Sequence, residues 1–191
     1  MESKLKGNIV IVSGPSGVGK GTIIKGVLSR VPSMKVAISA TTRLPRRAES
    51  NRKNYYFLSD SEFDKKIKEG DFLEWCDVLN KRYGTLKSEV EATVSQGKDV
   101  MLEIDTQGAQ KVKNRLPESI LIFIVPPTIK DLEQRLANRQ TEKGSDIKHR
   151  LDKAKVELSE IDYYDYVVVN KDIDKAIQSV VDIIDNNCKE N

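Results

Sequence analysis

Apolar runs and helical patterns alternate along most of this chain. Short, nearly continuous apolar runs predict buried strands at Asn8–Val12, Asp99–Ile104, Ser119–Val125 and Tyr166–Asn170. Apolar residues at helical spacing predict helices over residues 21–31, 106–116, 128–139, 146–161 and 172–185. Strands of this kind that alternate with helices indicate an α/β fold with a parallel sheet covered on both faces.

The stretch from about residue 36 to residue 85 breaks the alternation. Its pattern predicts strands over 35–43 and 54–59, a helix over 60–70, extended chain with a turn near Asn80 over 72–85, and a further helix over 86–97. Asp60 is the expected N-cap of the helix over 60–70, and Gly70 its end. The segment is therefore predicted to be a smaller, strand-rich insertion.

Polar and turn-forming residues follow four of the predicted strands. They are the loop that starts at Gly14, then Asp105, Pro126 and Asn170. Ligands of open parallel sheets collect where the strands end. We therefore expect these four places to converge on one edge.

The loop "GPSGVGKGT" lies between a predicted strand and a predicted helix, as a phosphate-binding loop does. Its backbone N–H groups and the start of the helix form an anion site, and Lys20 can reach the β- and γ-phosphates of a nucleotide. The expected nucleotide-binding residues of this P-loop are Gly14, Pro15, Ser16, Gly17, Val18, Gly19, Lys20, Gly21 and Thr22.

Gly21 stands where the motif normally places a Ser or Thr that holds magnesium. The ending Gly-Lys-Gly-Thr resembles that of adenylate kinases, in which water and nucleotide oxygens can hold the metal. Mg²⁺ keeps several waters readily, so one missing protein ligand is tolerable. This loop argues against a GTPase-type metal site and favours small-molecule phosphoryl transfer.

Two sets of arginines suggest further anion contacts. "SATTRLPRR" combines hydroxyls with Arg43 and Arg46, and arginine binds phosphate bidentately. Arg135 and Arg139 are four residues apart and share a helix face, while Arg150 follows a polar loop. From spacing alone, solvated surface charge is the favoured interpretation of both sets.

Motifs along essentially the whole chain resemble guanylate kinase in their order. They are "GPSGVGKGT", "SATTRLPR", "NYYF", "DFLEW", "YGT", "LEIDTQGAQ", "IFIVPP" and "LEQRLANRQTE…KHRL". The resemblance implies an ATP:GMP phosphotransferase, with dGMP as an expected second acceptor. It also implies a P-loop NTPase-type core (about 1–35, 98–127 and 164–191), a GMP-binding insertion (about 36–97) and a helical lid (about 128–163).

The resemblance also implies roles for individual residues. Those that match GMP-binding positions are Ser39, Arg43, Arg46, Tyr55, Glu74, Tyr83, Thr85 and Asp105. Glu74 and Asp105 would accept from the N1–H and N2 amino groups of guanine, a donor pair that adenine lacks. Thr85 stands where the family usually has a serine that donates to guanine O6. Without the resemblance, Glu74 could be an exposed strand residue and Asp105 a helix N-cap.

The remaining roles concern ATP and the transfer itself. Lys20 and Arg43, with Arg135, Arg139 and Arg150 of the lid, are the expected catalytic residues. Asn170 is expected near the adenine. Glu103 is expected to contact Mg²⁺, the expected cofactor with ATP, through water. The GMP phosphate is itself an anionic nucleophile, so in-line transfer needs no general base.

Two alternatives stay open. One is a non-catalytic guanylate-kinase-like binding module, although such modules generally lose the phosphate loop. The other is a kinase of another nucleoside monophosphate. Glu74→Gln would separate a guanine reader from the second alternative.

Length, charge and cysteine content add expectations about domain number, disulfides and partners. The chain has 191 residues, a net charge of +3 and two cysteines, Cys76 and Cys188. These values predict one domain, no disulfide framework and no nucleic-acid partner. Two cysteines without paired spacing favour a reducing cytoplasm. No apolar run approaches the roughly 20 residues of a membrane-spanning helix, so we expect no membrane partner. Monomer and homo-oligomer are both open.

Overall fold

The computed structural model describes residues 7–78, 80–137 and 144–188, with the side chains of 144–147 left out. Its core is a parallel sheet whose strands lie in the order β2, β7, β1, β8, β9. Their bounds are Lys35–Val36 (β2), Val100–Glu103 (β7), Ile9–Ser13 (β1), Ile120–Val125 (β8) and Tyr166–Val169 (β9). The predicted parallel sheet is confirmed.

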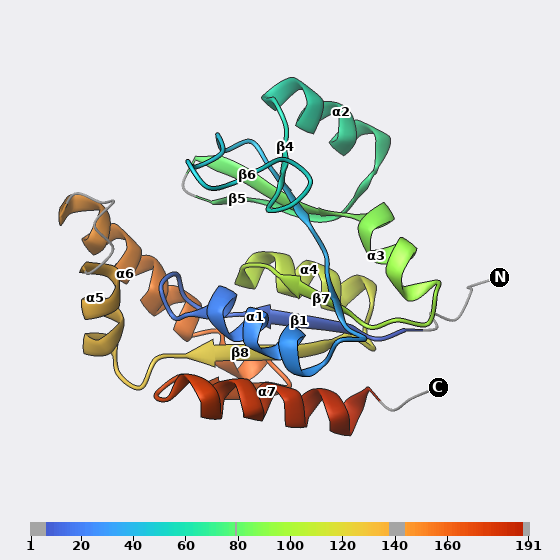
Figure 1. Ribbon diagram of the computed structural model, residues 1–191. Coiled ribbons are helices and arrows are strands. Elements are labelled where there is room, and N and C mark those ends of the chain that lie inside the picture. Colours follow the sequence, from blue (N-terminus) through green and yellow to red (C-terminus); the bar gives the residue numbers. More distant parts are fainter. Residues whose placement is uncertain (1–6, 79, 138–143, 189–191) are drawn as a thin grey trace.

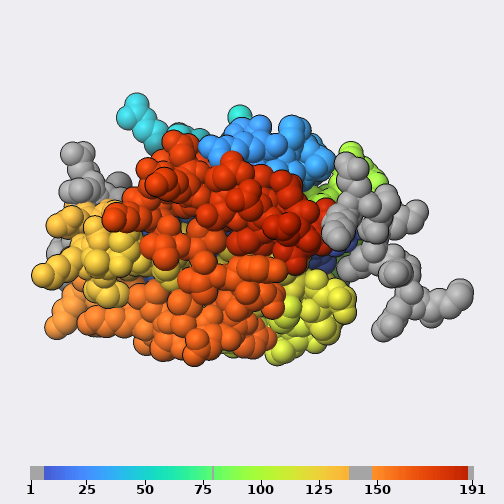
Figure 2. Space-filling model, turned by 90° about the horizontal axis from the view of Figure 1, so that it is seen from below, coloured from blue at the N-terminus to red at the C-terminus, as the bar shows by residue number. Residues whose placement is uncertain are grey.

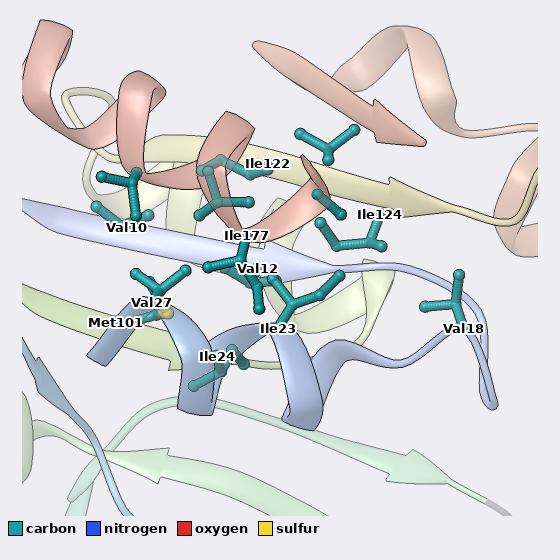
Figure 3. Close-up of a cluster of buried hydrophobic side chains, with 14 of the residues drawn as sticks. Val10, Val12, Val18, Ile23, Ile24, Val27, Met101, Ile122, Ile124 and Ile177 are labelled. Carbon is teal, nitrogen blue, oxygen red and sulfur yellow. The ribbon is translucent and has the colours of Figure 1, made fainter. Parts of the chain in front are cut away.

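Helices cover both faces of this sheet. Val10 and Val12 of β1 face α1 (Lys20–Arg30) and α7 (Ile173–Asn187), which pack side by side (Figures 2 and 3). The alternate residues of β1 face α3 (Lys87–Val94) and α4 (Thr106–Arg115). Because successive side chains of a strand point to opposite faces, one apolar run supplies both cores.

A second, mixed sheet stands over the core sheet in Figure 1. Its order is β4 (Tyr56–Phe57), β3 (Ser39–Thr41), β6 (Lys81–Leu86) and β5 (Phe72–Val78). Helix α2 (Asp60–Glu69) closes its small core, where the rings of Phe63 and Phe72 stack with centroids 4.4 Å apart.

Two local predictions were wrong. The run over 35–43 is not one strand: β2 pairs in the core sheet, whereas β3 pairs with β4 and β6 in the second sheet. The N-cap of α2 is Ser59 rather than Asp60. The Ser59 hydroxyl accepts from the Glu62 N–H while the Glu62 carboxylate accepts from the Ser59 N–H, which is a capping box.

The chain between β8 and β9 forms α5 (Ile129–Ala137), α6 (Gly144–Leu158) and a short 3₁₀ turn, Ile161–Tyr163. Figure 1 shows α5 and α6 at the end toward which β8 points, beside the loop between β1 and α1. Within the described residues, no helix has the length and apolar character needed to cross a membrane.

Candidate functional site

The phosphate loop occupies the turn from β1 into α1. Gly19 caps α1 in the left-handed region with φ 103°, a conformation that favours glycine. A Cβ built on Gly19 would lie 2.7 Å from Asn170 Nδ2, so a side chain has no room there. The loop therefore depends on glycine both for its backbone and for its packing.

Lys20 is held inside this loop. Its ammonium donates to the Gly14 carbonyl at 2.5 Å and to the Pro15 carbonyl at 3.3 Å. Burial lowers the pKa of Lys20, and nearby Glu103 is the main opposing influence. The loop thus holds a partly buried cation at the start of a helix, as an anion site requires.

Cavities lie on both sides of the loop. One, of about 240 Å³, is lined by Gly14, Ser16 and Lys20 together with side chains from both sheets; of the predicted site residues it includes Ser39, Tyr55, Glu74, Tyr83, Glu103 and Asp105. The other, of about 440 Å³, is lined by Gly17, Val18, Gly19, Thr22, Arg135 and Asn170, with residues 171–173. We call them the carboxylate cavity and the loop cavity.

Glu74 is a buried carboxyl group on β5. It is 3% exposed, and its Oε1 accepts a hydrogen bond from the Thr85 hydroxyl at 2.8 Å. Burial raises the pKa of Glu74 to about 7, Asp105 adds to that rise, and the Thr85 hydrogen bond opposes it. In this conformation the Thr85 hydroxyl donates its hydrogen bond to Glu74. This differs from the donation to guanine O6 that the family resemblance implies.

Asp105 is a helix cap, as one of the two sequence interpretations predicted, and it also lines the carboxylate cavity. Its Oδ1 accepts from the Gly108 N–H at 3.0 Å, so it is the N-cap of α4. The Cys76 thiol also donates to Oδ1, at 3.3 Å. Oδ2 is buried and without a hydrogen-bond partner, while the residue lines the carboxylate cavity. A helix cap and an available acceptor are therefore combined in one side chain.

Glycine allows Glu74 to approach α4. A Cβ on Gly108 would lie 2.7 Å from Glu74 Oε2. The Glu74 and Asp105 carboxyl groups therefore meet at the first turn of α4, where the helix dipole favours negative charge. A ligand with a pair of neighbouring N–H donors suits this arrangement.

Arg43 is held by a carboxylate that sequence reasoning missed. Its two terminal nitrogens donate to the two Glu49 oxygens at 2.9 and 3.0 Å, and one also donates to the Leu44 carbonyl. The guanidinium lies over the Tyr55 ring, 5.3 Å from its centroid, and the Glu49 hydrogen bonds raise the pKa of Arg43.

Of the other residues predicted to bind the GMP phosphate, all but Arg46 line the carboxylate cavity. Tyr55 and Tyr83 meet edge to face, with centroids 6.0 Å apart, and both line the carboxylate cavity with Ser39. Arg46 is exposed, and its backbone N–H donates to Glu49 at 2.8 Å. The structure brings together all of this set except the Arg46 side chain.

Arg135 and Asn170 brace the phosphate loop. Arg135 donates to the carbonyls of Val18 and Asn170 at 3.1 and 2.8 Å, and the Asn170 amide donates to the Val18 carbonyl at 2.7 Å. Arg150 Nη1 lies 3.5 Å from Ser16 Oγ. Arg139, the third arginine of the predicted set, lies outside the described residues.

The Gly21 position faces a carboxylate. A Cβ built there would lie 3.9 Å from Glu103 Oε2. Among the described residues, no group of three or more His, Cys, Asp or Glu side chains could enclose a metal. Glu103 therefore fits an ion held mainly by a ligand and by water, since Mg²⁺ retains much of its hydration.

Four residues at the site had no assigned role from the sequence: Glu49, Cys76, Lys153 and Glu157. Each was found through a partner rather than through a motif. Lys153 and Glu157 come from α6 and line the carboxylate cavity, far in sequence from the loops that they face.

Comparisons with known proteins agree with this geometry. The sequence model of the family described as guanylate kinase matches residues 6–187. A guanylate kinase of Caldanaerobacter subterraneus subsp. tengcongensis is 45% identical over 184 residues, 96% of this chain and 89% of the relative. One from Thermotoga maritima is 43% identical over 180 residues, 94% of this chain and 87% of the relative. The crystal structure of guanylate kinase from Anaplasma phagocytophilum matches with a TM-score of 0.81 and 31% identity, covering 97% of this chain and 88% of that one.

Proposed function

The chain belongs to the guanylate kinase family, and from this premise we propose how its residues carry out the ATP-dependent phosphorylation of GMP to GDP. The chain is thus an enzyme, a phosphotransferase. The observation that carries the assignment of substrates to cavities is that the buried Glu74 carboxyl group and the partly buried Asp105 carboxyl group line one cavity with Lys20.

GMP occupies the carboxylate cavity. Its guanine donates N1–H and N2 amino protons to Glu74 and Asp105, whose oxygens would be left unpaired by adenine. Thr85 orients Glu74. Arg43, Arg46, Ser39, Tyr55 and Tyr83 receive the phosphate, since arginine and tyrosine supply charge-assisted hydrogen bonds.

Not all N–H groups of Arg43 are used by Glu49 and Leu44, which supports its proposed contact with the GMP phosphate. Glu49 and the Leu44 carbonyl take three of its five N–H groups. Tyr83 is a further hydrogen-bond partner of Arg43, so a bound phosphate would share the remaining edge with Tyr83. We assign the second sheet with α2 and α3, about residues 36–97, as the GMP-binding insertion on this basis.

ATP binds through the phosphate loop, Gly14–Thr22, with the adenine on the side of Asn170 and the loop cavity. Lys20 would contact the phosphates, leaving the carbonyls on which it rests. Arg135, Arg139 and Arg150 belong to a lid of about residues 128–163, and they neutralise charge on the transferred group.

Mg²⁺ is the cofactor that we propose, held by Glu103 through water. When bound, it neutralises phosphate charge. The residues of this chain orient the two substrates in line and exclude water, which would otherwise accept the phosphoryl group. No protein base is required, because the GMP phosphate is anionic at neutral pH.

The proposal is tested by product formation from ATP and Mg²⁺ with GMP, dGMP, AMP, CMP and UMP in parallel. We expect GDP from GMP, little product from AMP, CMP and UMP, and loss of product in Lys20→Ala. Lys25→Ala is the matched control, because Lys25 is an exposed lysine of the same helix. Equal turnover of AMP would contradict the assignment of Glu74 and Asp105.

A further inference from the structure

The carboxylate cavity contains two carboxylate oxygens that are buried without a hydrogen-bond partner. They are Asp105 Oδ2 and Glu157 Oε2. The ammonium of Lys153 lies between the two groups, 3.8 Å from Asp105 Oδ2 and 3.6 Å from Glu157 Oε1. A buried carboxylate requires a nearby counter-charge, so Lys153 supplies one for both groups.

The geometry at Asp105 leaves one acceptor open. Oδ1 already accepts from Gly108 and Cys76. The 3.8 Å separation of Lys153 from Oδ2 is longer than a hydrogen bond. Lys153 therefore neutralises the carboxylate without filling the lone pair that a base would use.

Lys153 shares a helix face with a residue on the ATP side. Arg150, Lys153 and Glu157 follow one another on α6 at spacings of three and four, which places them on one face. Arg150 lies beside Ser16 of the phosphate loop, and Lys153 lies beside Asp105. A single face of α6 thus contacts the loop assigned to ATP and the carboxylate assigned to guanine.

We propose that Lys153 is a positioning residue that couples GMP binding to ATP binding through α6. This inference rests on the proposed function, because it takes Asp105 as an acceptor for guanine. A base seated against Asp105 displaces water from around the Lys153–Asp105 pair, and opposite charges attract more strongly when water is removed. The pair then holds α6 toward the cavity and keeps Arg150 beside the phosphate loop.

The test measures coupling directly. Calorimetric titration with β,γ-methylene-ATP, with and without saturating GMP, gives the ratio of the two dissociation constants. Coupling between sites is typically about 5- to 150-fold, so we expect at least about fivefold tighter binding with GMP in the parent protein. Lys153→Met should reduce the ratio to below about twofold, and Lys153→Arg should retain it.

Lys155→Met is the matched control. Lys155 is on the same helix, with a side chain 63% exposed, and it pairs with Asp152. The ratio of the two dissociation constants in Lys155→Met should match that of the parent protein. Thermal unfolding of each variant shows whether the fold is kept, and Lys153→Gln replaces the methionine variant if that variant does not fold.

The inference is overturned by no coupling in the parent, by a full ratio in Lys153→Met, or by an equal loss in Lys155→Met. A fall in kcat with coupling intact would likewise overturn it, because Lys153 would then act on the reacting phosphates. Failure of the proposed function looks different: the parent would bind the ATP analogue but not GMP.

Discussion

The phosphate loop and the two carboxyl groups border the same cavity, yet they are built by different means. The loop is made of peptide groups whose positions depend on glycine conformations within one short segment. Glu74 lies on β5 of the second sheet, whereas Asp105 caps α4 after β7 of the core sheet. Each depends on partners elsewhere, such as Thr85 and Cys76. The proposed phosphate site therefore depends on local backbone geometry, whereas the proposed base site depends on tertiary packing.

The largest effect is expected at Gly19, in the phosphate loop. Gly19→Ala places a Cβ 2.7 Å from Asn170 Nδ2 at a residue with positive φ. We expect KM for ATP to rise about 100-fold, which corresponds to about 2.7 kcal/mol of strain and lost packing. Initial-rate kinetics measure it. Gly97→Ala is the control, because Gly97 also has positive φ but has nothing within 4 Å of a built Cβ.

The next test removes a charge from the base side. Glu74→Gln replaces a carboxylate oxygen with an amide that donates toward the guanine donors. We expect kcat/KM for GMP to fall about 30-fold and discrimination against AMP to decrease, since hydrogen bonds to charged groups contribute about 1.5–3 kcal/mol. Asp77→Asn, an exposed position on the same strand, should change neither value. Unchanged selectivity in Glu74→Gln would show that another group reads the base.

The same carboxyl group should make GMP binding depend on pH. Burial raises the pKa of Glu74 to about 7, Asp105 acts in the same direction, and Thr85 and Lys111 oppose it. Two guanine donors require the ionised form, so KM for GMP should fall about tenfold between about pH 6 and about pH 8. Glu74→Gln should retain only the contribution of the GMP phosphate, which ionises near about pH 6.

Rising pH should have the opposite effect on the stability of the ligand-free protein. Between the ordinary pKa of 4.5 and about 7, the folded protein keeps a proton on Glu74 that the unfolded chain releases. The free energy of unfolding of the ligand-free protein should therefore fall as pH rises through that window. Denaturant titration at several pH values, with Glu74→Gln for comparison, measures this contribution; an unchanged dependence in the variant would contradict it.

A smaller effect is expected at Glu49. Glu49→Gln loses one of the two paired oxygens that hold Arg43. We expect GMP to bind about fivefold more weakly, because Arg43 is less well oriented toward the phosphate. Guanosine, which has no phosphate, should bind unchanged. Tighter GMP binding would instead make Glu49 a competitor of the phosphate.

The smallest effect is expected at Gly21. This residue has no positive φ, and a Cβ there meets nothing closer than Glu103 at 3.9 Å. Gly21→Ala should therefore keep kcat within about twofold and add about 0.5–1 kcal/mol to stability through its helix propensity. Turnover assays and thermal unfolding check both. A large loss of turnover would show that the loop needs glycine at this position.

The sequence was most informative where residues that act together are contiguous. Apolar runs predicted the core strands, and the motif that ends in Lys20 predicted a strand–loop–helix site. The cap of α2 was misplaced by one residue: Asp60 was predicted, whereas Ser59 caps the helix in a capping box with Glu62. The passage of the chain between sheets after Val36 left no local signal, because both parts have β propensity.

Site details that depend on pairs distant in sequence were not predictable. The Thr85 hydroxyl has several partners to choose from, and only the alignment of β5 with β6 shows that Glu74 accepts its proton. Similarly, nothing at Lys153 distinguishes it from neighbouring lysines of the same helix until α6 is placed against Asp105. Partner choice is a property of tertiary structure, which a linear motif does not encode.

Asn170 is a partner of the phosphate loop that becomes available only late in synthesis of the chain. It anchors the Val18 carbonyl across 152 positions of sequence, so the loop made first is braced by a residue made near the end. Domains emerge from the ribosome N-terminus first, and contacts distant in sequence form late. A nascent chain that stops before β9 therefore has the whole nucleotide motif and lacks the clamp that holds it in shape.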